Sequence, residues 1–212
     1  MFIDLVLPKS NEKEFIEIAD KLGISRICFI YNFKNKNNFL QNQDKVNKLQ
    51  EKTEIKLSIG LIADSKNISK AKKLAKIVIY KSIGNDRHAI EKSKANVVFD
   101  LETIATKDSM HHRNSGLNQI LCKLANKNNV MIGFSFSTIL NEERMIRSQI
   151  LGRLMQNIRL CRKYKVKTVI ASFAEKPYDL RSCYDLKSVF ISLGMHPEEA
   201  KDSLEEIYKC LS

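Results

Sequence analysis

Short apolar segments recur along the chain, separated by longer segments in which apolar residues are spaced as on one face of a helix. Each short segment is rich in Ile, Val or Phe, which is typical of strands buried on both faces of a parallel sheet. Seven strands are predicted: FIDLVL (2–7), ISRICFIY (24–31), IKLSIGLIA (55–63), KIVIYKS (76–82), NVVFD (96–100), VMIGFSFS (130–137) and KTVIAS (167–172).

The spacing of these strands predicts repeated strand–helix units, and therefore an α/β fold of the TIM-like (β/α) barrel type. The usual barrel has eight strands and about 250 residues, whereas this chain has 212 residues and shows two helical patterns, near 185–193 and 198–210, after its last predicted strand. We therefore predict a short or distorted barrel with about seven parallel strands. A doubly wound open sheet is the alternative.

No linker rich in Ser, Gly or Pro interrupts the chain, so we predict one domain over residues 1–212. Within it, the polar segment FKNKNNFLQNQ (33–43) is predicted to be a loop. Phe134 and Phe136 alternate along the strand at 130–137 and are predicted to lie in the core.

The segment HHRNSGLNQILCKLANKNNV (111–130) predicts a helix, with Asn114 or Ser115 as its N-cap and Asn128-Asn129 at its end. The residues HHR then come directly before the helix. Its predicted apolar stripe consists of Leu117, Ile120, Leu121, Leu124 and Ala125.

A second helix is predicted over 142–163. Arg147 falls inside its apolar stripe, where a charge must be paired or functional. The stripe consists of Ile146, Ile150, Leu154, Ile158 and Cys161.

The chain carries 36 Lys and Arg against 24 Asp and Glu, a formal net charge of +12. The excess is local, because residues 144–174 contain eight basic residues and no acid, and residues 65–85 contain six lysines and no acid. Such segments favour a polyanionic partner, above all nucleic acid. An ordinary solvated surface in a lysine-rich proteome is the alternative for the net charge alone.

Five scattered cysteines make no ligand-spaced pair, which favours reduced thiols in a cytosolic protein. No apolar run reaches the roughly 18 residues needed to span a bilayer, and the N-terminus lacks the basic start of a signal peptide. We therefore expect a cytoplasmic protein with no membrane partner.

Loops at the carboxyl ends of barrel strands carry the chemistry of this fold. The segment HHRNSG (111–116) follows the strand at 96–100, so we expect it at that face. The other positions expected there are Tyr31, Asp64, Ser82, Asp100, Ser137 and Ser172.

We predict no metal site and no catalytic residue. Only His111 and His112 cluster, and adjacent loop residues seldom ligate one ion. The first strand has one acid, Asp4, and no His-x-His. The chain also lacks the G-x-S-x-G, Walker A and G-x-G-x-x-G motifs.

An anion site at the predicted helix N-terminus explains Arg113 better. A cation is unfavourable beside the positive end of a helix dipole unless an anion binds to both the arginine and the amides. Gly116 allows a close backbone approach. Structural pairing of Arg113 with Asp100 or Asp108 stays open as the alternative.

These residues resemble a known family. HHRNSGLNQILCKLANKNNVMIGFSFS, followed by QNIRLCRKYKVKTVIASFA and PYDLRSCYDLKSVFISLGM, is similar to archaeal ribonuclease P protein component 3. That family is the counterpart of the 30-kDa subunit of eukaryotic RNase P and RNase MRP. The likeness covers nearly the whole chain and is strongest from about Val97 to Met195.

The resemblance implies a TIM-like barrel related to the polymerase-and-histidinol-phosphatase phosphoesterases, but without their metal ligands. It implies a protein subunit of ribonuclease P, which removes the 5′ leader of precursor tRNA with its catalytic site and Mg²⁺ in the RNA subunit. The implied partners are that RNA, a small ferredoxin-like subunit, other RNase P proteins and, indirectly, precursor tRNA. No cofactor is expected on this chain.

The RNA-contacting residues that the resemblance carries over are Arg87, His112, Arg113, Lys123, Arg162 and Arg181. Two other classes of function stay open: an autonomous metal-dependent phosphoesterase on the same barrel, and a scaffold that binds only proteins.

Overall fold

The computed structural model describes residues 1–211, which form one parallel sheet of seven strands in the order β1 to β7. Each predicted strand is present, so the prediction from apolar segments is confirmed. The strands are β1 (Asp4–Val6), β2 (Arg26–Asn32), β3 (Lys56–Ile62), β4 (Val78–Lys81), β5 (Val97–Phe99), β6 (Met131–Ser135) and β7 (Thr168–Ala171).

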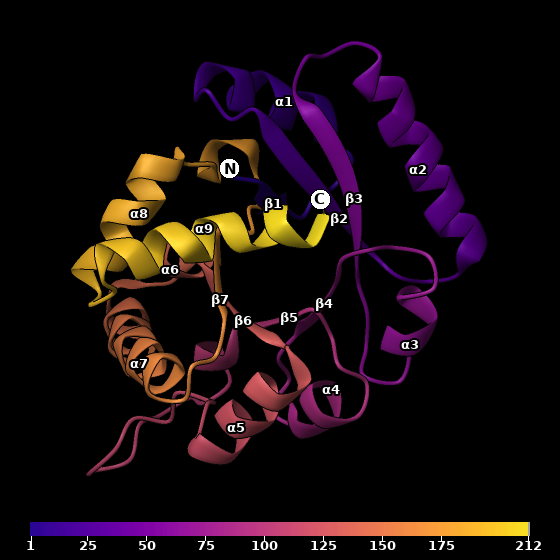
Figure 1. Ribbon diagram of the computed structural model, residues 1–212. Helices are drawn as coiled ribbons and strands as arrows, with labels where there is room; N and C mark the ends of the chain where they lie inside the picture. Colours follow the sequence, from indigo (N-terminus) through magenta and orange to yellow (C-terminus); the bar gives the residue numbers. More distant parts are fainter. Residues whose placement is uncertain (212) are drawn as a thin grey trace.

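Helices surround this sheet on its outer side (Figure 1). The long helices are amphipathic, and most successive strands are connected by a helix, as in a barrel of strand–helix units. The helices are α1 (Glu12–Lys21), α2 (Lys36–Gln50), α3 (Ile68–Ala71), α4 (Arg87–Glu91), α5 (Gln119–Asn128), α6 (Phe136–Asn141), α7 (Arg144–Lys163), α8 (Cys183–Ser192) and α9 (Pro197–Leu211), with 3₁₀ turns η1 (Leu101–Thr103) and η2 (Pro177–Asp179).

The sheet closes on itself, which confirms the short TIM-like barrel and makes the doubly wound sheet wrong. The amide of Leu7 donates to the carbonyl of Ala174 at 2.8 Å, and Val6 and Ala174 form a parallel bridge. The buried carboxylate of Asp4 adds a contact between the first and last strands, since its Oδ1 accepts from the amide of Ser172 at 2.7 Å.

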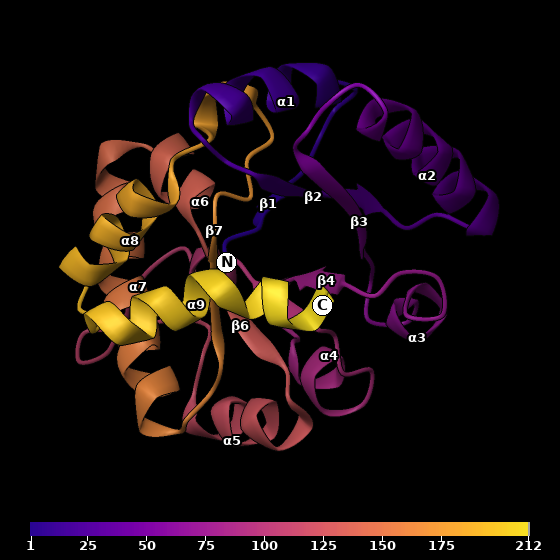
Figure 2. The same ribbon diagram turned by 45° about the horizontal axis from the view of Figure 1, so that its top comes forward.

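The position of an eighth strand–helix unit is taken by α8 and α9. Helix α9 crosses the end of the barrel near the N-terminus in both views (Figures 1 and 2). Ile207 of α9 packs in the same buried cluster as Ile3 and Val169 of the barrel interior. Helix α9 therefore covers the amino end of the strands, while their carboxyl end stays open.

Two segments differ from their predictions. The predicted loop at 33–43 is mostly the start of α2, because the Asn35 side chain accepts from the amide of Asn38 and caps the helix. Its few apolar residues, such as the buried Phe39, suffice for a surface helix. Strand β6 ends early because Ser135 caps α6, so Phe134 lies in the core as predicted, but Phe136 is helical and half-buried.

We predict that Asp4 makes the stability of the barrel depend on pH. Burial raises the pKa of Asp4 to about 7. The folded state therefore holds a proton that the unfolded chain loses near pH 4, and the resulting stability is lost as pH rises from about 4 through about 7. Relative to Asp4→Asn, which cannot ionise, the wild-type chain should lose up to about 4 kcal/mol over this range. Urea unfolding of both proteins at several pH values measures this, and a constant difference would contradict it.

Candidate nucleic-acid interface

The segment that joins β5 to α5 folds back on itself before α5 begins. Gly116 lies against Leu101 at the start of the segment, with a φ of +75°. A Cβ at this position would lie 2.2 Å from the carbonyl oxygen of Leu101, so only glycine fits. The segment 101–118, which we call the β5–α5 loop, is thus closed at its base.

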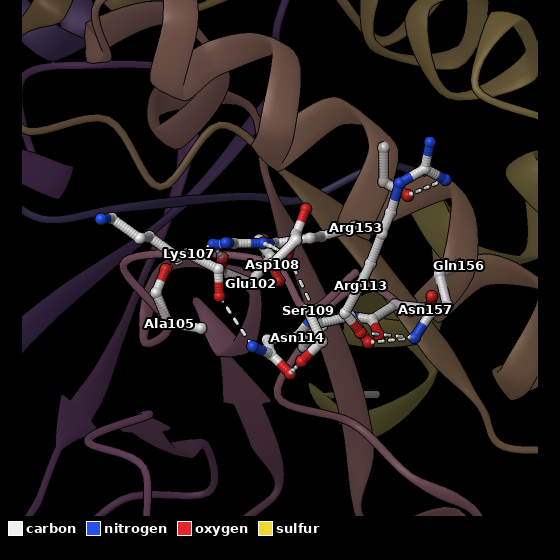
Figure 3. Close-up of polar contacts among 12 residues, drawn as sticks. Glu102, Ala105, Lys107, Asp108, Ser109, Arg113, Asn114, Arg153, Gln156 and Asn157 are labelled. Carbon is white, nitrogen blue, oxygen red and sulfur yellow. Dashed lines mark hydrogen bonds and ion pairs between the residues drawn. The ribbon is translucent and has the colours of Figure 1, made fainter. Parts of the chain in front are cut away.

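A buried arginine of α7 organises this loop (Figure 3). The side chain of Arg153 is 2% exposed, and its Nε donates to Oδ1 of Asp108 at 2.7 Å. Its Nη1 donates to the carbonyls of Glu102 and Ala105, at 2.9 and 2.6 Å. One guanidinium therefore binds three points of the loop.

Asp108 and Asn114 complete this network. Asp108 also accepts from the amide of Asn114, and the Asn114 side chain donates to the carbonyl of Lys107 at 2.7 Å. Desolvation opposes ionisation of Asp108, but the hydrogen bonds from Arg153 and Asn114 outweigh it and lower its pKa. The carboxylate is therefore charged when it pairs with Arg153.

Glu102, near the start of the same loop, is buried. Desolvation, with a contribution from the nearby Asp100, raises its pKa to about 8. Burial therefore favours the neutral form of Glu102, and the ion pair of Arg153 is with Asp108.

The loop presents Arg113 on the surface of α7. Its Nη1 donates to the carbonyl of Gly152 at 3.2 Å. Gln156 donates to the backbone carbonyl of Arg113 and to the hydroxyl of Ser115, and Asn157 donates to the carbonyl of Ser115. The backbone on both sides of Ser115 is thus fixed by one face of α7, while the Arg113 side chain is exposed.

The predicted N-cap of α5 is wrong. Asn118 is the cap, and its Oδ1 accepts from the amides of Ile120 and Leu121. The cap already occupies the amides of Ile120 and Leu121, so these first amides of α5 are not free to bind an anion together with Arg113 as predicted. The predicted end is confirmed, because Asn129 adopts a left-handed conformation there.

The apolar stripe of α5 is also shifted from its prediction. Leu117 is buried but lies before the helix, whereas Ile120 is 56% exposed. The fully buried residues of α5 are Cys122 and Ala125. The later N-cap explains the shift, because it moves the helix start past Leu117.

The two acids considered as partners of Arg113 form ion pairs with other residues. Asp108 pairs with Arg153, and Asp100 lies 3.3 Å from Nζ of Lys81. Arg147 is paired, as its place in an apolar stripe required, and donates to the carbonyls of Leu140 and Glu142.

A groove lies between the β5–α5 loop and α7, with a volume of about 520 Å³. It brings His112 and Arg113 together, and within residues 1–211 none of the side chains that line it is acidic. Lys123 lies further along the same seam between α5 and α7, with its Nζ 6.0 Å from the ring centre of Tyr164.

The other predicted contact residues lie on separate elements. Arg87 pairs with Glu91 on α4, and Arg162 pairs with Glu199 of α9 at 2.6 Å. Arg181 precedes α8, where its guanidinium lies 5.3 Å from the centre of the Phe136 ring. The six predicted residues therefore do not form a single site.

The groove is distinct from the open mouth of the barrel. A cavity of about 440 Å³ at the carboxyl ends of the strands is lined by Asp100, Ser137 and Lys81, among others. The β5–α5 loop leaves this face and packs on α7, so the expectation that HHRNSG belongs to the mouth is wrong. In residues 1–211, no group of three or more His, Cys, Asp or Glu could hold a metal ion.

Sequence reasoning missed Gly152, Arg153 and Asn157, which hold the loop in place. Arg153 had a signal comparable to that of Arg147, because it lies between the stripe residues Ile150 and Leu154. Gly152 also carried a signal in the sequence, since a glycine inside a helix lowers helix stability by about 1 kcal/mol relative to alanine.

The family model of RNase P subunit p30 matches residues 1–211. Two curated relatives are named ribonuclease P protein component 3. That of Methanocaldococcus jannaschii is 31% identical over 110 residues, which are 52% of this chain and 47% of the relative. That of Thermococcus kodakarensis is 38% identical over 92 residues, 43% of this chain and 42% of the relative. The matched region thus spans less than half of each relative.

Solved structures share the fold. A chain in the cryo-EM structure of archaeal ribonuclease P with mature tRNA has a TM-score of 0.78 and 22% identity, over 98% of this chain and 89% of that one. A. niger ochratoxinase has a TM-score of 0.56 and 9% identity, over 96% of this chain and 69% of that one. At these identities the likeness shows the barrel fold.

We predict that Arg153→Met destabilises the protein by about 3 kcal/mol, because it leaves Asp108 without its cationic partner and two loop carbonyls without their donor. The β5–α5 loop should then become a substrate for trypsin at Lys107 and Arg113. Chemical denaturation and limited proteolysis measure the two effects. Arg159→Met, an exposed change on the same helix, is the control and should alter stability by less than about 0.5 kcal/mol. Equal effects of both variants would contradict the role given to Arg153.

Proposed function

The chain belongs to the RNase P subunit p30 family, and from this premise we propose that it is a protein subunit of ribonuclease P. In this role it binds and stabilises the catalytic RNA that removes the 5′ leader of precursor tRNA. The observation that carries the proposal is the match of the family model over residues 1–211. The exposed Arg113 lies in a groove that no acid of residues 1–211 lines, and it supplies a contact for RNA.

The proposed mechanism is electrostatic. Lysine and arginine side chains neutralise phosphates of two RNA segments, so the segments can approach one another at a lower Mg²⁺ concentration. Mg²⁺ and bond cleavage belong to the RNA subunit, and this chain supplies neither a catalytic residue nor a cofactor. A duplex segment is read by its shape and backbone more than by its base edges.

The proposed contacts are Arg87, His112, Arg113, Lys123, Arg162 and Arg181. Arg113 and His112 share one groove, which makes them the strongest of the six. Arg87 and Arg162 already have carboxylate partners on this chain, so RNA must compete with those ion pairs.

The proposed partners are the RNase P RNA, a small ferredoxin-like RNase P protein, other RNase P proteins and, through the assembly, precursor tRNA. The solved complex that contains a chain of this fold is an archaeal RNase P with mature tRNA, which supports an assembly of this kind. We place the assembly in the cytoplasm. No helix in residues 1–211 has the length and apolar character that a membrane crossing requires.

We predict that Arg113→Ala lowers precursor-tRNA processing by the reconstituted complex about tenfold at limiting Mg²⁺, because a charge-assisted contact to phosphate is lost. Thermal stability should change by less than about 1 kcal/mol, since Arg113 is exposed and bonds to one backbone carbonyl. Lys73→Ala, on the α3 side of the barrel, is the control. A large loss of stability in Arg113→Ala would instead make Arg113 a structural residue.

The chain alone is assayed beside this complex with Mg²⁺, Mn²⁺ or Zn²⁺. Metal-dependent cleavage of a phosphoester without RNA, abolished by changing His111 or His112, would replace the proposal with an autonomous phosphoesterase.

Salt dependence gives a second prediction. If about five phosphates are contacted, the affinity for a single-stranded segment of the RNA should fall with a log–log slope of roughly −3 to −4 against salt. Titrations at several salt concentrations measure the slope. A slope near zero would contradict phosphate neutralisation and favour a scaffold that binds only proteins.

A further inference from the structure

The groove beside Arg113 has an apolar floor. Leu117 is 5% exposed, Leu160 of α7 is half-buried, and Ile104 is 37% exposed at its edge. Apolar side chains that face a recess of about 520 Å³ under a polar rim mark a binding site more than an ordinary surface.

The rim of the groove carries an arginine, an imidazole and side-chain amides. Arg113 and His112 lie on the loop side, and Gln156 lies on the α7 side. No acidic side chain of the described chain lines the groove, so its charge is complementary to that of an anion.

The glycine at position 152 fixes the place of the Arg113 guanidinium. An added Cβ would lie 2.7 Å from its Nε and 2.8 Å from its Cζ. The planar guanidinium therefore lies directly on the helix surface, with its Nη1 bonded to the Gly152 carbonyl. A planar, charged group held in this way can bind a phosphate or stack on a base.

The seam continues from this groove along α7. Leu160 lies two turns after Gly152, and Tyr164 one turn further, about 18 Å in all. The hydroxyl of Tyr164 donates to Oε1 of Gln119 on α5, and Lys123 and Lys163 lie over its ring. Lys123 and Lys163 therefore add positive charge on the seam beside the groove, although neither lines it.

We propose that this groove binds an unpaired nucleotide of the RNA, with its phosphate on Arg113 and its base against Leu160 and Leu117. The proposal rests on the proposed function and names the RNA element that this site takes. In a duplex the base faces are stacked and out of reach, so only an unpaired base can cover the apolar floor. An acidic peptide would satisfy the cations, but the experiment below separates it from RNA.

The test compares the affinity of the full chain for a short single-stranded RNA and for a blunt RNA duplex with the same number of phosphates. Leu160→Glu places a carboxylate on the floor, and Gly152→Ala displaces the guanidinium without removing its charge. Ile146→Glu adds the same charge to an exposed position of α7 outside the groove and is the matched control. Circular dichroism checks that each variant is folded.

Leu160→Glu and Gly152→Ala should each weaken single-strand binding about tenfold and duplex binding by less than about twofold, with Ile146→Glu close to wild type for both. Equal losses for the two RNAs, equal losses in the control, or tighter binding of a poly-glutamate peptide than of the single strand would overturn the inference. If Leu160→Glu does not fold, the single-strand affinity of Gly152→Ala alone tests the inference.

Processing by the reconstituted complex separates this inference from the proposed function. If the wild-type chain supports processing but the two groove variants bind the single strand normally, the groove inference fails and the proposed function stands. If the wild-type chain does not stimulate processing, the proposed function itself fails.

Discussion

The buried guanidinium of Arg153 is the interaction on which the surface beside α7 depends. A charge with 2% of its side chain exposed needs partners, and here one carboxylate and two carbonyls accept from its Nε and Nη1. The bonds draw a long connection off the mouth of the barrel and onto α7. Gln156 and Asn157 of the same helix fix the backbone around Ser115, and Arg113 lies over Gly152.

The barrel provides a rigid support for that loop. The chain just after β7 bridges to β1 through Ala174 and Val6, and α9 covers the amino end of the barrel. Because the ends of the sheet are joined, α7 has a fixed place on its outer side. The open mouth keeps a mixed set of charges, as shown by the pair of Lys81 with Asp100, so it offers a polyanion less than the α5–α7 seam does.

Local pairing decides which positive charges are available to a partner. Arg153, Arg87 and Arg162 are each neutralised by a carboxylate of the same chain, although two of them belong to a segment without acids. The partners of Arg153 and Arg162 come from other parts of the sequence: Asp108 from the β5–α5 loop and Glu199 from α9. Arg113 differs, because no acid lines its groove within the described residues. Net charge alone therefore overstates the surface that RNA can use.

The sequence by itself determined the seven strands, the barrel, the helices before and after KTVIAS, and the family. The strands, the barrel and the helices depend on local periodicity, in which each apolar run is read independently of the rest, whereas the family was indicated by the resemblance of motifs such as HHRNSG and DLRS. It also identified Arg113 as unusual, but placed it on a helix N-terminus that begins later, at Asn118. Only the tertiary structure decided where the loop goes, because it depends on the pairing of Arg153 with Asp108, which lie 45 residues apart in the sequence. The helical start of 33–43 and the early end of β6 were decided by single side-chain caps, Asn35 and Ser135, whose hydrogen bonds compete closely with the alternative backbone conformations.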